Sequence, residues 1–257
     1  MVDESARQQA GKLLPGQALL AVSNVSKSFR GLRAVAGVSF AVERGGIVGL
    51  IGPNGAGKTT LFNVIAGVYR PDTGGVTLEG RVINGLRPDE VCHAGIARTF
   101  QLVRPFADLS VRDNVVVGAL RDGSPLADAR QTADEALERL GLAEQRHRRA
   151  AELTLPDRKR LEVARALATR PQLLLLDEVM AGLRPTETDE MVETFRALNR
   201  DTGLTILLIE HVMRAVMALS QHIVVLHHGE KISEGTPHHV VSDPAVLDCY
   251  LGEEAEV

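Results

Sequence analysis

The sequence predicts an α/β fold built on a mostly parallel β-sheet with helices on its faces. Short apolar runs rich in β-branched residues alternate with segments of helical periodicity, as is typical of layered α/β proteins. The run 173–176 contains no polar residue, which is expected for a parallel strand buried on both faces. A glycine-rich segment directly follows another apolar run, 47–51, and opens a helical pattern. These three observations place the chain in the α/β class.

The same patterns predict the individual elements. Strands are expected at residues 20–22, 38–42, 47–51, 76–78, 173–176, 205–209 and 223–226. Helices are expected at residues 59–68, 157–168, 187–199 and 212–219.

The stretch from about residue 88 to 165 is mostly helical in pattern and lacks strong strands after residue 100. Ser110 and Asp113 resemble a capping box that begins a helix at residues 111–120. A second apolar helical face precedes the capping residue Gly141 and consists of Leu126, Ala129, Ala133, Leu137 and Leu140. We therefore expect a helical subdomain inserted into one α/β domain of residues 18–257, with residues 1–17 as a flexible leader.

Composition excludes several classes of protein. The 257 residues are 44% hydrophobic and 24% charged, which is ordinary for a globular chain, and the net charge of −4 argues against a nucleic-acid partner. Cys92 and Cys249 lie far apart without metal-ligand spacing, which favours thiols in a reducing compartment. No run approaches the roughly 20 apolar residues that a membrane-spanning helix needs. Any work at a membrane would therefore require recruitment by another chain.

The strongest chemical signal is a phosphate-binding loop between the strand at 47–51 and the following helix. Its residues are Gly52, Pro53, Asn54, Gly55, Ala56, Gly57, Lys58, Thr59 and Thr60. The glycines let main-chain N–H groups converge on phosphate oxygens, and the helix N-terminus adds a partial positive charge. In such a loop Lys58 reaches the β- and γ-phosphates of ATP, and the Thr59 hydroxyl is a ligand of Mg²⁺.

Two acids follow the apolar run 173–176. Asp177 is expected at the carboxyl edge of the sheet beside the phosphate loop, where it can hold Mg²⁺ through a water molecule. Glu178 is then placed to polarise the water that attacks ATP. Alone, two acids after a strand would indicate a solvated turn, but together with the loop they predict an ATPase.

With these motifs the chain resembles the ABC ATPases from about residue 20 onward. The resemblance implies a P-loop core with an N-terminal antiparallel β portion. It also implies that Phe29 stacks on adenine, although a core phenylalanine is the alternative. By the same resemblance Gln101 contacts Mg²⁺ and senses the membrane partner, and His211 contacts the γ-phosphate.

More narrowly, four segments resemble the ATP-binding proteins of branched-chain amino acid importers: residues 95–101, 161–169, 229–237 and 250–254. That subfamily also includes importers of urea, amides and some aromatic acids. The resemblance implies a dimer of ATPase subunits holding two MgATP, two transmembrane permease subunits and, indirectly, a solute-binding protein. The chain is then expected at the cytoplasmic face of the cell membrane as a peripheral subunit.

The chain departs from the family at the signature loop, which closes over the ATP of the opposite subunit and normally reads Leu-Ser-Gly-Gly-Gln. Here Leu153 is followed by Thr154, Leu155, Pro156 and Asp157. Proline has no N–H to donate, and the aspartate brings negative charge toward a phosphate. Thr154 and Asp157 also resemble a capping box, so the alternative is a capped helix with no nucleotide role. We expect a heterodimer, because a homodimer would carry this defect at both sites.

Two smaller departures are Val179, where proline is usual, and Arg184, where Asp or Asn is common in the dimer-facing loop. Arg184 would either disturb the dimer interface or pair with an acid of the partner. Two rival functions stay open. One is an ATP clamp with little hydrolysis, which the altered signature favours and Glu178 and His211 oppose. The other is a soluble ABC ATPase that acts on DNA or ribosomes, which the short insert and the net charge oppose.

Overall fold

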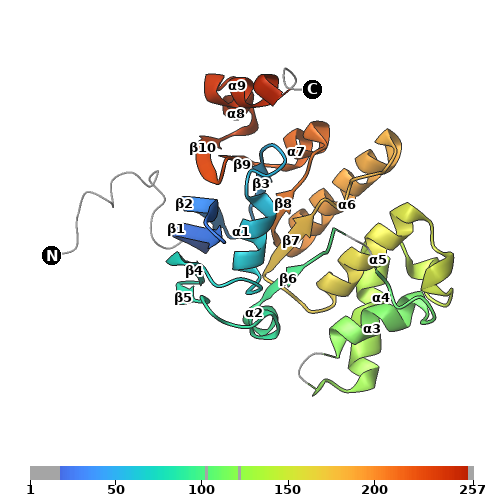
Figure 1. The fold of residues 1–257 in the computed structure, drawn as a ribbon. Coiled ribbons are helices and arrows are strands. Elements are labelled where there is room, and N and C mark those ends of the chain that lie inside the picture. Colours follow the sequence, from blue (N-terminus) through green and yellow to red (C-terminus); the bar gives the residue numbers. More distant parts are fainter. Residues whose placement is uncertain (1–17, 102–103, 121–122, 254–257) are drawn as a thin grey trace.

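The computed structural model describes residues 18–101, 104–120 and 123–253. Two β-sheets lie beside a group of helices that projects from the larger sheet (Figure 1). The predicted α/β fold class is confirmed. The leader expected at residues 1–17 lies outside the described residues.

The smaller sheet is antiparallel and has the strand order β2-β1-β4-β5. It pairs Val22 with both Phe40 and Val76, so its centre is apolar. These strands extend well beyond the predicted cores at residues 20–22, 38–42 and 76–78. Their bounds are β1 (Ala18–Phe29), β2 (Leu32–Glu43), β4 (Thr73–Leu78) and β5 (Arg81–Val82).

The larger sheet has six strands in the order β10-β9-β3-β8-β7-β6 and is parallel except for the pair β9 and β10. Two of its strands were not predicted: β6 has only three residues, and β10 is rich in polar side chains. The bounds are β3 (Ile47–Ile51), β6 (Ile96–Arg98), β7 (Leu173–Asp177), β8 (Thr205–Ile209), β9 (His222–His227) and β10 (Glu230–Gly235).

The helices that the sequence predicts are found to within a few residues at each end, whereas those at residues 88–94, 237–241 and 244–253 were not predicted individually. Ser110 begins α3 as its N-cap and accepts a hydrogen bond from the Asp113 N–H, as its capping motif predicts. In the described part of the chain, no helix is long and apolar enough to span a membrane. The bounds are α1 (Lys58–Ile65), α2 (Pro88–Ala94), α3 (Val111–Ala119), α4 (Leu126–Arg139), α5 (Leu155–Leu167), α6 (Pro185–Thr202), α7 (Met213–Leu219), α8 (Pro237–Val241) and α9 (Pro244–Glu253).

Helices α3, α4 and α5 pack together at one side of the larger sheet (Figure 1). The limits of about 88 and 165 for a helical subdomain stay a prediction, although β6 within them is hydrogen-bonded into the six-stranded sheet.

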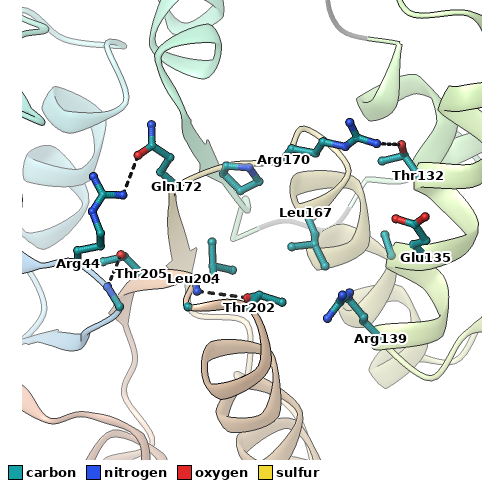
Figure 2. Close-up of a pocket in the computed structure, with 14 residues that line it drawn as sticks. Arg44, Thr132, Glu135, Arg139, Leu167, Arg170, Gln172, Thr202, Leu204 and Thr205 are labelled. Atoms are coloured by element: carbon teal, nitrogen blue, oxygen red, sulfur yellow. Dashed lines mark hydrogen bonds between the residues drawn. The ribbon is translucent and has the colours of Figure 1, made fainter.

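A cavity of 670 Å³ lies between α4 and the starts of β7 and β8 (Figure 2). Three helices end at this cavity, and its lining includes Arg44, Arg139 and Arg170. These cations offset the negative ends of the helix dipoles.

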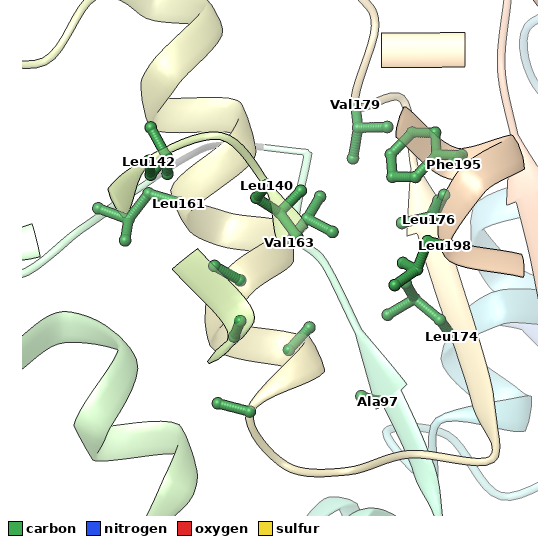
Figure 3. Close-up of a cluster of buried hydrophobic side chains, with 14 of the residues drawn as sticks. Ala97, Leu140, Leu142, Leu161, Val163, Leu174, Leu176, Val179, Phe195 and Leu198 are labelled. Atoms are coloured by element: carbon green, nitrogen blue, oxygen red, sulfur yellow. The ribbon is translucent and has the colours of Figure 1, made fainter. Parts of the chain in front are cut away.

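Strand β7 is buried on both faces, as its apolar run predicts. Leu173 and Leu175 pack in the same cluster as Phe62 of α1, whereas Leu174 and Leu176 face the cluster that includes Phe195 of α6 (Figure 3). All four leucines have no exposed surface. Full burial of such a side chain stabilises a fold by about 1.5–3 kcal/mol, so the packing holds the carboxyl end of β7 firmly in place.

Candidate functional site

The loop between β3 and α1 has a backbone that only glycine can adopt at two positions. Gly52 has φ +146°, and a Cβ there would lie 2.0 Å from the carbonyl oxygen of Leu226. Gly57 has φ +99°, and a Cβ there would lie 2.3 Å from the carbonyl oxygen of Ala34. The loop is therefore pressed against neighbouring backbone, and its two glycines make that approach possible.

The loop presents a helix N-terminus without a side-chain cap. Gly57 is the N-cap of α1 and makes no side-chain capping bond, and the Cβ position of Gly55 meets nothing within 4 Å. Lys58 is 5% exposed, and its Nζ donates to the carbonyl oxygens of Gly52 at 2.6 Å and Pro53 at 2.8 Å. An ammonium group and helix N–H groups thus lie at one loop, and this combination suits an anionic phosphate.

Asp177 ends β7 with a carboxylate that is almost completely buried. Its Oδ2 accepts a hydrogen bond of 2.7 Å from Nη2 of Arg98, whose Nη1 donates to Asn63 Oδ1 of α1 at 2.5 Å. The main-chain N–H of Asp177 donates to the Thr99 hydroxyl at 3.0 Å. The other carboxylate oxygen, Oδ1, is buried and has no hydrogen-bond partner among the described residues. Arg98 therefore compensates the charge and leaves one oxygen to bind a ligand.

Glu178 brings together three of the predicted residues. Its Oε1 lies 2.9 Å from Nε2 of His211, and its Oε2 accepts a hydrogen bond of 2.7 Å from Nε2 of Gln101. These residues follow β7, β8 and β6, which are adjacent in the sheet. Three loops at one sheet edge thus converge on a single carboxylate.

Phe29 lies at the end of β1 and is 37% exposed, so it is not a core residue. Its ring meets the Tyr69 ring edge-on with centroids 5.1 Å apart, and Nζ of Lys27 lies 5.5 Å from its centroid. A partly exposed aromatic ring of this kind can stack on a nucleobase, and its role with adenine stays a prediction.

The altered signature loop begins α5 and is capped as its sequence predicts. Thr154 is the N-cap, and its hydroxyl accepts a bond of 3.4 Å from the Asp157 N–H and donates to Asp157 Oδ2 at 2.9 Å. The same carboxylate accepts from Gln145, and its Oδ1 lies 3.6 Å from Nη1 of Arg160. Asp157 is thus engaged within its own subunit. Of the two alternatives, the contacts within this subunit support the capped helix, and a role toward the nucleotide of a partner stays a prediction.

The other two departures take ordinary places. Val179 is 3% exposed and packs in the core. Arg184 is the N-cap of α6, and its Nε donates to Glu187 Oε1 at 2.7 Å, although the side chain stays 79% exposed. Arg184 thus pairs with an acid of its own chain, and its two predicted roles at a dimer interface stay predictions.

The residues expected to hold Mg²⁺ fit a hard cation, because they offer a hydroxyl, an amide and a carboxylate oxygen: Thr59, Gln101 and Asp177. The buried, unpartnered Oδ1 of Asp177 is the observation that supports this fit. None of the predicted site residues lines the cavity of Figure 2, which lies at the opposite edge of the sheet.

Sequence reasoning missed three charged residues beside the site, of which Lys159 and Glu210 are buried and Arg98 has a side chain that is 11% exposed. Lys159 of α5 is 5% exposed, and its Nζ donates to the main-chain oxygen of Glu178 at 3.0 Å. Glu210 is 1% exposed, and its Oε1 accepts from the Met180 N–H at 2.7 Å. Burial raises the pKa of Glu210 to about 7 and lowers the pKa of Lys159. Arg98 is the third of these residues. Like Glu210, it stands where a buried strand ends, and a charged residue at that position is the sequence signal that could have found both.

Comparisons with known proteins agree with this geometry. Residues 35–181 match the family model described as ABC transporter, and residues 230–256 match the model described as branched-chain amino acid ATP-binding cassette transporter. The high-affinity branched-chain amino acid transport ATP-binding protein LivG of Salmonella typhimurium is 41% identical over 252 residues, which cover 92% of this chain and 99% of the relative. The corresponding protein BraF of Pseudomonas aeruginosa is 40% identical over 250 residues, covering 91% and 98%.

Two solved structures resemble the fold closely. One is a nucleotide-free ATP-binding cassette from an ABC transporter, with a TM-score of 0.83 and 33% identity over 91% of this chain and 98% of that one. The other is an ATP-binding cassette of an ABC transporter in its ADP conformation, with the same score and identity over 91% and 99%.

Proposed function

The chain belongs to the ABC transporter family of ATP-binding proteins and is a transport ATPase of that family. On this premise we propose that it powers the uptake of branched-chain amino acids or a related small polar solute. The observation that carries the catalytic part is the carboxylate of Glu178, which lies between Gln101 and His211 at the end of β7. The C-terminal match over residues 230–256 and the names of the relatives support the choice of solute.

Each residue has a defined task in this proposal. Glu178 orients the attacking water and accepts its proton, and His211 fixes the carboxylate and meets the γ-phosphate. The N–H groups of the loop 52–60 and Lys58 stabilise the charge on the phosphates. Thr59, Gln101 and Asp177 would hold Mg²⁺, which would supply positive charge against the phosphate oxygens.

Uptake by the assembled transporter tests the choice of solute. The chain is reconstituted with its permease subunits in proteoliposomes, and ATP-dependent uptake of leucine, urea and an aromatic acid is compared. We expect leucine to be accumulated and to stimulate hydrolysis. Accumulation of urea or the aromatic acid without leucine would transfer the chain to another branch of the subfamily.

We further propose that the chain pairs with a second, different ATPase subunit at the cytoplasmic face of the membrane. Pro156 offers no N–H to the nucleotide of a partner, whereas the loop 52–60 is intact, so a partner with an ordinary signature would give one strong site. The chain alone is then expected to be mostly monomeric and slow. The combined change Leu155→Gly, Pro156→Gly and Asp157→Gln should increase ATP-driven dimerisation, measured by light scattering. A wild-type chain that already dimerises and turns over ATP several times per second would contradict this pairing.

The altered signature also favours a second candidate function, an ATP clamp with little hydrolysis. The contacts of Glu178 favour hydrolysis instead, because a clamp needs no oriented carboxylate. Turnover by the assembled transporter separates the two: a clamp binds ATP and releases phosphate at a rate that does not respond to solute.

A further inference from the structure

The residue proposed to orient the attacking water sits in a strained backbone conformation. Glu178 has φ +51°, in the left-handed region that residues other than glycine rarely occupy. Such a conformation persists only where the surroundings hold it. What holds the turn of residues 178–180 therefore also decides where the carboxylate of Glu178 points.

Three hydrogen bonds from two other segments, α5 and residues 209–210, hold this turn, in addition to its internal bond from the Ala181 N–H to the Glu178 carbonyl oxygen at 3.2 Å. The Glu178 N–H donates to the carbonyl oxygen of Ile209 at 2.9 Å. The Glu178 carbonyl oxygen accepts from Nζ of Lys159 at 3.0 Å, and the Met180 N–H donates to Glu210 Oε1 at 2.7 Å. Two of the three anchors are therefore charged side chains, and both lie outside the motifs that the sequence singles out.

Both side chains are buried at a cost that packing alone does not explain. Lys159 is 5% exposed and Glu210 is 1% exposed. The charged groups that face Glu210 are Lys159, which favours its ionised form, and Glu178, which opposes it; Oε2 of Glu210 has no hydrogen-bond partner among the described residues. Apolar residues of similar volume often serve stability as well as a buried ion pair does. The two charged groups are thus better explained by their hydrogen bonds to the turn of residues 178–180 than by a contribution to stability.

Lys159 also links the turn to the altered signature loop. It lies on α5, five residues after the N-cap Thr154, so a movement of the helix that begins at this loop displaces its ammonium group. We propose that Lys159 is a positioning residue: it holds the main-chain carbonyl of Glu178 so that the carboxylate faces Gln101 and His211, and it couples this turn to the signature helix of the same subunit. This inference rests on the proposed ATPase function.

Replacing Lys159 by methionine keeps most of the side-chain volume and removes the donor. Lys159→Met should lower kcat for ATP hydrolysis by the assembled transporter roughly tenfold to 100-fold, the scale expected for a misplaced catalytic group, and leave KM and nucleotide affinity within about twofold. Lys231→Met is a matched control, because Lys231 also donates to a main-chain oxygen, that of Ser39 at 2.6 Å, and pairs with Glu234 far from the turn. It should leave kcat unchanged.

A second variant separates positioning from stability, because Lys159→Met also removes the cation that favours the ionised form of the buried Glu210. Adding Glu210→Gln removes the ionisable group, and the glutamine oxygen can still accept from Met180. The double variant should regain thermal stability close to that of the wild type and keep the low kcat, because the Glu178 carbonyl still lacks the Lys159 donor and keeps only the bond of 3.2 Å from the Ala181 N–H.

Recovery of kcat together with stability would overturn the inference and leave Lys159 a structural residue. A Lys159→Met variant with wild-type kcat would overturn it equally. Failure of the wild-type transporter to hydrolyse ATP would instead refute the proposed function, so the two failures are distinguishable.

Discussion

The replacement Arg98→Met should destabilise the protein strongly, because it leaves the buried carboxylate of Asp177 without its cation. The Arg98 side chain is 11% exposed and that of Asp177 is 3% exposed, and the bond between them is 2.7 Å long. The guanidinium carbon also lies 5.9 Å from the Phe62 ring centroid and 5.7 Å from that of Phe100, contacts that a methionine can largely replace. Breaking one side of a buried pair costs about 3–5 kcal/mol. At roughly 2–4 °C per kcal/mol for a chain of this size, the melting temperature should fall by roughly 6–20 °C.

Urea unfolding followed by circular dichroism, in EDTA and without nucleotide, measures this loss. Arg200→Met is the matched control: Arg200 pairs with Asp201 at the surface, where both side chains are more than half exposed, so stability should change by less than about 1 kcal/mol. Adding Asp177→Asn to Arg98→Met should recover much of the loss. An Arg98→Met variant within about 1 kcal/mol of the wild type would refute the reasoning that Arg98 is the cation that compensates Asp177.

Two further predictions concern Lys58 and Glu210. Lys58→Ala should weaken ATP binding, measured by fluorescence titration, while AMP affinity changes little because stacking on Phe29 survives. Equal losses of affinity for both nucleotides would mean that the bonds from Lys58 to the loop carbonyls matter more than its bonds to phosphate. Burial raises the pKa of Glu210 from 4.5 to about 7, so its protonated form stabilises the fold below pH 4.5 and this contribution is lost as the pH rises through 7. Between pH 5 and pH 8, the free energy of unfolding should therefore fall less for Glu210→Gln than for the wild type, and the difference should reach about 3 kcal/mol. Urea titrations that show equal falls for the two proteins would contradict this.

The sequence predicts the centre of this fold better than its edges. The strand β7, the phosphate loop and the two acids Asp177 and Glu178 carry strong local patterns, and each lies where those patterns predict. Strand β6 is missed because three residues are too few to show a period. Strand β10 is missed because an edge strand tolerates many polar side chains.

The burial of these charged side chains could not be predicted from the sequence pattern alone. Lys159 stands between Arg158 and Arg160, so the run looks like a solvated helical face, and only tertiary packing makes its middle residue 5% exposed. Asp157 carries a pattern with two interpretations, a helix cap and a charge directed at a partner's phosphate, and its contacts with Thr154, Gln145 and Arg160 support the cap. The direction of the Lys159 side chain depends on Glu178, which lies 19 residues away in the sequence.

The measurement that tests the central claim most directly is phosphate release from MgATP by the assembled transporter, with wild type and Glu178→Gln compared side by side. Glutamine keeps the size of the side chain and its contacts with Gln101 and His211, but it cannot accept a proton from water. We predict that turnover falls by roughly two to four orders of magnitude while ATP still binds and the closed dimer accumulates. Hydrolysis by Glu178→Gln within about tenfold of the wild-type rate would contradict the assignment of Glu178 as the catalytic base.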